Sequence, residues 1–271
     1  MSVFGKKTPP RDVPQLAKLF GLKKLYIKDE SKQRYGTWKD RRSERIVACA
    51  QQKGISNVVL ISSGNAGYSL GRLGQQAGMA VTVVVDHMLS LSIKRRLVKA
   101  CTRVLEVDLA KYIFSSRALV RLAKGSSREA FLDVTNGYEE AYESLVDEIR
   151  RVRPDYLICP VGSGEAFVGL VRGIKKHRLP TVCIGVAPKK SSRSLADKLC
   201  TPWTPYATAL QKLTKRKHLL LRVSEAEIAH SLKMAKKYMR CEASSAIVFA
   251  GLARVPKGSV VILINSGTSS R

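Results

Sequence analysis

Residues 57–67 read NVVLISSGNAG, and this stretch decides the fold class. The run NVVLISS (57–63) carries apolar side chains on both faces, which is typical of a strand buried between two layers. It leads through a turn of small polar residues into a helix that we expect from Ala66 to Gln76. A buried strand, a turn and a helix in this order predict a unit of a parallel sheet covered by helices.

The same alternation extends over almost the whole chain. Further strands are expected at 24–29, 80–86, 103–107, 155–161, 181–187 and 259–265, and further helices at 39–52, 92–99, up to 121, 138–151, 166–176, 225–238 and 244–252. Buried strands joined by helices predict an α/β protein with parallel-rich sheets covered by helices. In such sheets ligands bind beyond the carboxyl ends of the strands. This rule indicates four stretches: the loop before Lys39, SSGNAG, VGSGEAF and NSGTSS.

Length and composition are those of a globular protein. The 271 residues, 45% hydrophobic and 25% charged, suffice for one large domain or two small ones. No apolar run approaches the roughly 18 residues of a membrane helix, and the start MSVFGKKTPPRDV has no secretory h-region. We therefore expect a cytoplasmic protein without membrane contact.

The formal net charge of +27 is spread along the chain rather than gathered in a tail. Such a field attracts phosphates, anionic metabolites and acidic partners, and it makes non-specific binding of nucleic acid possible. The six cysteines form no CxxC pair, and the four histidines show no ligand spacing. We therefore expect no metal, and we expect Cys159 and Cys183, which lie in apolar strand-like runs, to be buried structural thiols.

Three turns of small residues carry groups that could bind a ligand. The SSGNAG turn at 62–67 offers hydroxyls, an amide and N–H groups at a helix start, which suits a carboxylate or phosphate. An ordinary helix cap is the alternative interpretation. The GSGEAF turn at 162–167 lets the backbone approach a phosphate closely, and Ser266 in NSGT could present a hydroxyl to a ligand.

Lys39, in GTWKDRR (36–42), is the candidate nucleophile. At the start of a helix the positive dipole end disfavours the ammonium, and partial burial against Trp38 would lower the lysine pKa further. A neutral amine is what a Schiff-base lysine needs. Solvated surface charge is the alternative, because it describes most of the 48 lysines and arginines.

The ordered set GTWKDR, SSGNAG, PVGSGEAF, EASSAIVFAGL and INSGT resembles the fold-type-II pyridoxal-phosphate enzymes, the tryptophan-synthase-β superfamily. The similarity runs from about Thr8 to Thr268. It implies a two-domain α/β fold with pyridoxal 5′-phosphate in the cleft between the domains. The large cofactor-binding domain would comprise residues 1–42 and 134–271, and the small mobile domain with the carboxylate loop residues 43–133.

The resemblance also implies a role for each motif. Lys39 would be the Schiff-base lysine and the base that takes the α-proton. The substrate carboxylate would be held by Ser62, Ser63, Gly64, Asn65 and Ala66, with Asn65 also facing the ring hydroxyl of the cofactor. The cofactor phosphate would be held by Gly162, Ser163, Gly164, Glu165 and Ala166. Ser266 would meet the pyridine nitrogen, and a serine there does not force that nitrogen to be protonated.

Among these enzymes the chain most resembles threonine synthases, in TPPRDVPQLAKLFGLKKLYIKDE, SSGNAGYSL and VSEAEI. This implies a lyase that performs β/γ-elimination or replacement on an amino acid, converting O-phosphohomoserine to threonine in amino-acid biosynthesis. The chain has QRYGTWK where threonine synthases usually show Asn-Pro-Thr-Gly-Ser-Phe-Lys, and FLDVTNGYEE in place of their Asn-Pro-x-Arg. Family habit suggests a homodimer.

Other functions stay open at this point. Cysteine synthase and serine/threonine ammonia-lyase are the alternatives with the same cofactor. Two alternatives belong to other functional classes. One is a basic nucleic-acid-binding protein on a degenerate enzyme scaffold, and the other is a non-catalytic module that retains the cofactor.

Overall fold

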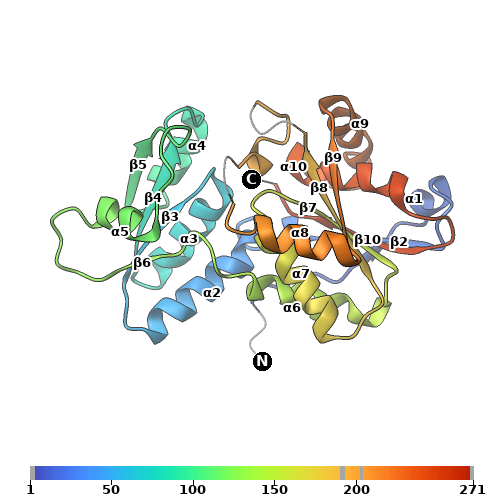
Figure 1. The fold of residues 1–271 in the computed structure, drawn as a ribbon, viewed down its shortest axis with the longest axis horizontal. Helices are drawn as coiled ribbons and strands as arrows, with labels where there is room; N and C mark the ends of the chain where they lie inside the picture. The colour runs from blue at the N-terminus through green and yellow to red at the C-terminus, as the bar shows by residue number, and fades with distance from the viewer. Residues whose placement is uncertain (1–3, 190–192, 202–203, 269–271) are drawn as a thin grey trace. The chain divides into compact units, whose positions relative to one another are not determined.

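The computed structural model describes residues 4–189, 193–201 and 204–268 (Figure 1). The chain forms two compact units: unit 1 is Met1–Trp38 with Glu139–Arg271, and unit 2 is Lys39–Tyr138. Unit 1 holds a six-stranded sheet and unit 2 a four-stranded sheet. Among the named strands of the described residues, β1 and β2 pair antiparallel and the other pairs are parallel. The predicted α/β class is confirmed.

The sheet of unit 1 has the strand order β1-β2-β10-β7-β8-β9. Its strands are β1 (Arg11–Asp12), β2 (Lys24–Asp29), β7 (Tyr156–Pro160), β8 (Val182–Pro188), β9 (Leu219–Val223) and β10 (Val260–Asn265). Leu263 in β10 lies opposite Ile27 of β2 on one side and Ile158 of β7 on the other. The last strand of the chain is therefore central, and its carboxyl end emerges beside those of β2 and β7.

Helices cover both faces of this sheet. They are α1 (Pro14–Leu19), α6 (Glu140–Ile149), α7 (Glu165–Lys176), α8 (Ala207–Arg216), α9 (Glu225–Ala235) and α10 (Ala243–Ala246), with the 3-10 helices η1 (Glu30–Lys32), η2 (Arg150–Val152), η3 (Asp197–Leu199) and η4 (Ile247–Arg254). Val261 and Leu263 pack in the core with α1, α9 and η4, whereas Ile262 and Ile264 pack with α6 and α7. The side chains of β10 thus alternate between two core layers, one on each face of the sheet.

Unit 2 has the strand order β5-β4-β3-β6. Its elements are α2 (Lys39–Gln52), β3 (Asn57–Ile61), α3 (Asn65–Gln76), β4 (Ala80–Asp86), α4 (Leu91–Val98), β5 (Arg103–Val107), α5 (Ser116–Lys124) and β6 (Phe131–Asp133). Val58 and Leu60 face the core shared with α2, α3 and α4, and Val59 faces α5. None of the helices within the described ranges is long and apolar enough to cross a membrane.

The structure corrects two expected helices. The helix expected at 244–252 is the short α10 followed by η4, whose tighter winding brings Gly251 against the sheet. A Cβ at Gly251 would lie 2.7 Å from the Ile158 side chain, so glycine permits this close packing. The helix expected at 225–238 ends earlier, at Ala235. The strands β1, β6 and β9 and the helices α1 and α8 come in addition to the expected elements.

A buried charge cluster joins the N-terminal segment of unit 1 to its sheet. The Lys28 ammonium, fully buried, lies 2.9 Å from Oε1 of Glu30 and 2.8 Å from Oε2 of Glu148 on α6. It also donates to the carbonyl of Thr8 at 2.7 Å. The Lys28 ammonium therefore contacts two carboxylates that have almost no access to water.

Replacing Lys28 by methionine is expected to lower the free energy of unfolding by about 3–5 kcal/mol, because two buried carboxylates then lose the ammonium that contacts both of them. Chemical denaturation measures this. Lys111→Met is the control: its ion pair with Asp108, at 3.4 Å, involves a lysine side chain that is 76% exposed, so its loss should have little effect on stability. The triple variant Lys28→Met, Glu30→Gln, Glu148→Gln should recover part of the loss. Equal stability of Lys28→Met and Lys111→Met would contradict this assignment.

Candidate active site

The turn after β10 is fixed by its own asparagine. Both amide protons of Asn265 are used, because Nδ2 donates to Oδ1 of Asp29 at 2.8 Å and to the carbonyl of Arg240 at 3.0 Å. Its Oδ1 accepts the N–H of Gly267 at 3.2 Å. Asn265 is fully buried, so these partners determine how the amide is oriented. The turn therefore presents Ser266 from a rigid support.

The GTW stretch of unit 1 lies against this turn. The N–H of Trp38 donates to the carbonyl of Ser266 at 3.0 Å, and that of Thr268 donates to the carbonyl of Gly36 at 2.9 Å. These bonds form an antiparallel bridge between Thr37 and Gly267. Trp38 is anchored in turn by an edge-to-face contact with Tyr142, with ring centroids 5.3 Å apart. Two motifs from opposite ends of the sequence are thus hydrogen-bonded to each other.

Ser245 is a site residue for which the sequence interpretation gave no role. It is fully buried on α10, and its Oγ lies 2.7 Å from Oγ of Ser266 and 2.7 Å from the carbonyl of Gly267. The motif EASSAIVFAGL contributed only to the family resemblance. A serine pair within an apolar run was the available signal, because buried hydroxyls need partners.

The GSGEAF turn follows β7, the strand next to β10. Gly164 is the N-cap of the twelve-residue helix α7 in left-handed conformation, φ +94°, and it has no side chain to accept from the N–H groups of the first turn. A Cβ at Gly162 would lie 3.3 Å from Cα of Leu199. The Thr204 hydroxyl donates to the Ser163 carbonyl and ties the turn to the chain before α8. Glu165 is buried.

These features fit the phosphate of the cofactor that the resemblance implies. Small residues keep the turn open at its backbone, and the N-terminus of a long helix favours an anion there. The turn lies at the carboxyl end of β7 and the Ser266 turn at that of its neighbour β10. Unit 1 alone therefore brings the expected phosphate loop and the expected ring-nitrogen serine to one edge of its sheet.

Lys39 is the first residue of α2 and of unit 2, and it is joined by a peptide bond to Trp38. It is half-buried. The aspartate behind it has a structural role, because the carboxylate of Asp40 accepts a hydrogen bond from the Ser69 hydroxyl of α3 at 2.7 Å. Arg42 donates to the carbonyl of Thr135 at 2.8 Å. The helix start that carries Lys39 is therefore held firmly within unit 2.

The SSGNAG turn follows β3 and starts α3 at Asn65. The Ser62 hydroxyl accepts the N–H of Gly64 at 3.1 Å and that of Gly67 at 2.9 Å, so Ser62 caps the turn. Ser63 is exposed, while Asn65 and Ala66 are half-buried. Because Ser69 lies one turn after Asn65 and bonds to Asp40, the first turns of α2 and α3 are neighbours.

The thiol of Cys101 contacts this turn and has low reactivity. Cys101 donates from Sγ to the carbonyl of Gly67 at 3.4 Å, and burial raises the pKa of its thiol to about 12. Such a thiol stays neutral at physiological pH and packs as a small apolar group.

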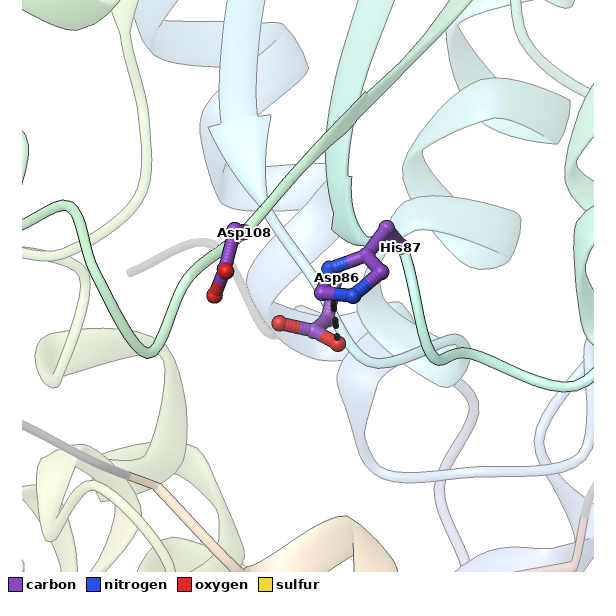
Figure 2. Close-up of side chains that lie close together, drawn as sticks. All are labelled: Asp86, His87 and Asp108. Carbon is purple, nitrogen blue, oxygen red and sulfur yellow. Dashed lines mark ion pairs between the residues drawn. The ribbon is translucent and has the colours of Figure 1, made fainter.

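A group of three polar side chains in unit 2 has the composition of a cation site (Figure 2). The ligand atoms of Asp86, His87 and Asp108 lie within 4.8 Å of one another, at the carboxyl ends of β4 and β5. The carboxylate of Asp86, however, already accepts the N–H groups of Met88 at 2.9 Å and Leu109 at 3.0 Å. Slight desolvation opposes the shift, but hydrogen bonds from Lys111 and Ala110 bring the pKa of Asp108 below its ordinary value. Both carboxylates therefore accept hydrogen bonds from the backbone of their loops. That the protein uses no metal stays a prediction.

Known proteins share this architecture. The chain matches the fungal L-serine ammonia-lyase of Rhizomucor miehei with a TM-score of 0.80 at 18% identity, covering 99% of this chain and 95% of that one. It matches an O-acetylserine dependent cystathionine beta-synthase of Helicobacter pylori with a TM-score of 0.81 at 19% identity, covering 98% and 94%. At such identities the likeness shows the fold.

Sequence relatives point to the same group of proteins. A threonine synthase of Methanosarcina acetivorans is 25% identical over 178 residues, 64% of this chain and 44% of that protein. A human L-serine dehydratase/L-threonine deaminase is 27% identical over 176 residues, 63% and 53%. The match thus spans about half the length of these curated relatives. The family model described as pyridoxal-phosphate dependent enzyme matches residues 1–267. The chain therefore belongs to the family of pyridoxal-phosphate-dependent enzymes.

Proposed function

We propose that this protein holds pyridoxal phosphate through Lys39 and catalyses elimination or replacement on an amino acid that carries a leaving group. O-phosphohomoserine is the proposed substrate, with threonine and inorganic phosphate as products after addition of water. Deamination of serine or threonine, the activity named for the human relative, is the second candidate.

The bridge between Thr37 and Gly267 is the observation that carries the proposal. It fixes the residue before Lys39 to the carbonyl of Ser266 at 3.0 Å. The GSGEAF turn follows the neighbouring strand. Within unit 1, the Ser266 turn and the GSGEAF turn therefore lie at the sheet edge where α/β proteins bind ligands, and the residue before Lys39 is hydrogen-bonded to that edge.

Each motif has a task in this proposal. The N–H groups of Gly162 to Ala166 bind the phosphate, with no charge contributed by the small side chains. The turn from Ser62 to Ala66 binds the substrate carboxylate at the start of α3, and the amide of Asn65 orients the ring. The amine of Lys39 accepts the proton from the substrate Cα. When bound, the cofactor supplies the electron sink that stabilises negative charge at that carbon.

The charge of the chain favours a phosphate ester as substrate. A net charge of +27 attracts a dianion more strongly than the zwitterions serine and threonine. This attraction is sensitive to salt, so the encounter rate with O-phosphohomoserine should fall as ionic strength rises. Serine and threonine should show almost no such dependence.

A direct product assay tests the proposal. Purified protein with pyridoxal phosphate is given O-phosphohomoserine, L-serine, L-threonine, or O-acetylserine with sulfide, and the products are measured. We expect threonine and phosphate in equal amounts from the first substrate, with kcat/KM decreasing as salt increases. Protein without added cofactor is the control. A 2-oxo acid and ammonia from serine or threonine alone would identify an ammonia-lyase instead, and no product from any substrate would contradict the proposed chemistry.

A further inference from the structure

The edge of the unit 1 sheet at which its parallel strands begin is strongly basic. Because β2, β10, β7, β8 and β9 run parallel, the segments that lead into them lie together at this edge: 20–24, 255–259, 150–155, 175–181 and 214–218. We define the basic rim as the exposed cations of these segments that have no ion pair with a described residue. They are Lys23, Lys24, Lys257, Arg150, Arg151, Arg153, Lys175, Arg178, Lys215, Arg216 and Lys217.

The acidic groups at this edge already have partners. Asp155 is the one acidic residue within the five segments, and its carboxylate accepts the N–H of Val260 at 2.8 Å. Asp147, in the last turn of α6, is engaged by Lys176 at the end of α7 and by His177. The positive field of the basic rim is therefore not compensated by the segments that carry it, and it attracts an anionic partner.

Hydrogen bonds between neighbouring segments hold the basic rim in a fixed arrangement. The N–H of Gly258, before β10, donates to the carbonyl of Gly21, before β2, at 2.8 Å. The hydroxyl of Thr181, before β8, donates to the carbonyl of Pro154, before β7, at 2.6 Å. Adjacent strands lie about 4.8 Å apart, so five strands place these cations in a row of roughly 20 Å. Such a row complements a polymer of regularly spaced negative charges better than a small anion.

Two arginines of the basic rim have a backbone conformation that favours glycine. Arg153 has φ +47° and Arg178 has φ +49°. Arg178 follows α7 at the position where helices commonly end in glycine: its N–H donates to the carbonyl of Lys175 at 3.0 Å, and that of Leu179 donates to the carbonyl of Ile174 at 3.0 Å. A side chain in this conformation causes strain that glycine avoids. Since folding does not require arginine at either position, we assign the two guanidinium groups to binding.

We propose that the basic rim binds the phosphodiester backbone of a double-stranded nucleic acid without reading its sequence. Arginine suits this partner, because its planar guanidinium binds phosphate oxygens in pairs. Unpaired bases would need exposed aromatic side chains to stack on, but Phe20, the Phe, Tyr or Trp residue of the five segments, packs against the core. The rim lies one strand length, roughly 17–20 Å, from the GSGEAF turn and Ser266. This binding is therefore independent of the proposed function.

The test is fluorescence anisotropy of labelled duplexes of about 20 base pairs, one of DNA and one of RNA, titrated with the full chain at several salt concentrations. Binding of either duplex supports the inference, and the duplex that binds more tightly identifies the source of the phosphodiester backbone. The double variant Arg153→Gly, Arg178→Gly should weaken binding about tenfold or more, and the slope of log K against log salt concentration should fall by about 1 for each lost phosphate contact. Because glycine relieves the strain at both positions, the Tm should stay equal or rise. Unfolding therefore cannot account for the weaker binding.

Arg117→Gln, Arg121→Gln is the matched control, since both are exposed arginines of α5 in unit 2 and the pair removes the same charge. It should leave the affinity and the salt slope almost unchanged. A second pair from the rim, Lys24→Gln with Lys257→Gln, should lower both. Absence of duplex binding by the wild-type protein at about 0.1 M salt, or equal losses in the rim pairs and the control pair, would overturn the inference. Vesicles that contain phosphatidylserine are the further probe. If the rim pairs weaken vesicle binding and leave duplex binding unchanged, the partner is an anionic membrane and the inference is overturned.

Discussion

Replacing Gly267 by alanine is expected to lower the free energy of unfolding by roughly 2–5 kcal/mol, through backbone strain and overpacking together. Gly267 has φ +125°, a conformation that side chains other than hydrogen rarely allow. A Cβ there would lie 2.2 Å from the Gly36 carbonyl oxygen and 2.6 Å from Cα of Thr37. Because both atoms belong to the backbone, the two segments would have to separate. The bond between Trp38 and Ser266 would break with them.

Gly258→Ala is the matched control for this variant. Gly258 also has a positive φ, +78°, but a Cβ there would meet nothing within 4 Å. Its replacement should therefore cost only the strain, about 1–2 kcal/mol. Denaturant unfolding of both variants measures the difference, and cofactor absorbance shows whether the site survives. Equal losses of stability in the two variants would show that the contact between 36–38 and 266–268 contributes nothing.

The parallel sheets could be predicted because their strands are buried on both faces. Runs such as VVLI in β3 and VVILI in β10 are apolar at every position, and each is followed by a Gly or Ser turn. Such runs satisfy strand propensity and burial at the same time, so local and long-range preferences agree. The helix α2 was also expected with the bounds that the structure has, Lys39–Gln52.

Elements that are half-exposed escaped prediction. Strand β9 lies at the edge of its sheet, and four of its five residues are at least partly exposed. Its residues read LLLRV and are mostly apolar, but leucine favours helices as much as strands, so the run does not identify a strand by itself. The helix expected at 244–252 illustrates another limit. Its apolar pattern is compatible with both α and 3-10 winding, and close packing of Gly251 on the sheet accompanies the observed mixture.

The segments of the candidate site could be proposed from sequence motifs, but the hydrogen bonds that join these segments could not. Turns that follow buried strands identified the segments of Lys39, Asn65, Gly164 and Ser266. The hydrogen bond from Trp38 to Ser266 joins residues more than 220 positions apart, and nothing local in the sequence encodes it. The contacts of Ser245 were missed because its partners, Ser266 and Gly267, lie 21 and 22 positions further along the chain and follow from the tertiary fold.

Lys39→Ala is expected to abolish the function that we propose. Loss of the base alone should lower kcat by roughly 10²- to 10⁴-fold, and loss of the covalent attachment adds to this. The visible absorbance of lysine-bound cofactor should disappear as well. Lys53→Ala is the control, since this exposed lysine lies just beyond the end of α2. It should leave activity and absorbance unchanged, and similar losses in the two variants would indicate a general effect of charge.

The lysine that carries the cofactor can be identified by chemical trapping. The protein is incubated with pyridoxal phosphate, reduced with borohydride to fix any lysine-bound cofactor as a stable amine, digested and analysed by mass spectrometry. We expect one dominant modified peptide, with the pyridoxyl group on Lys39, and its loss in Lys39→Ala. Absence of modification in the wild-type protein, or modification spread over exposed lysines to the same extent in both proteins, would contradict the account.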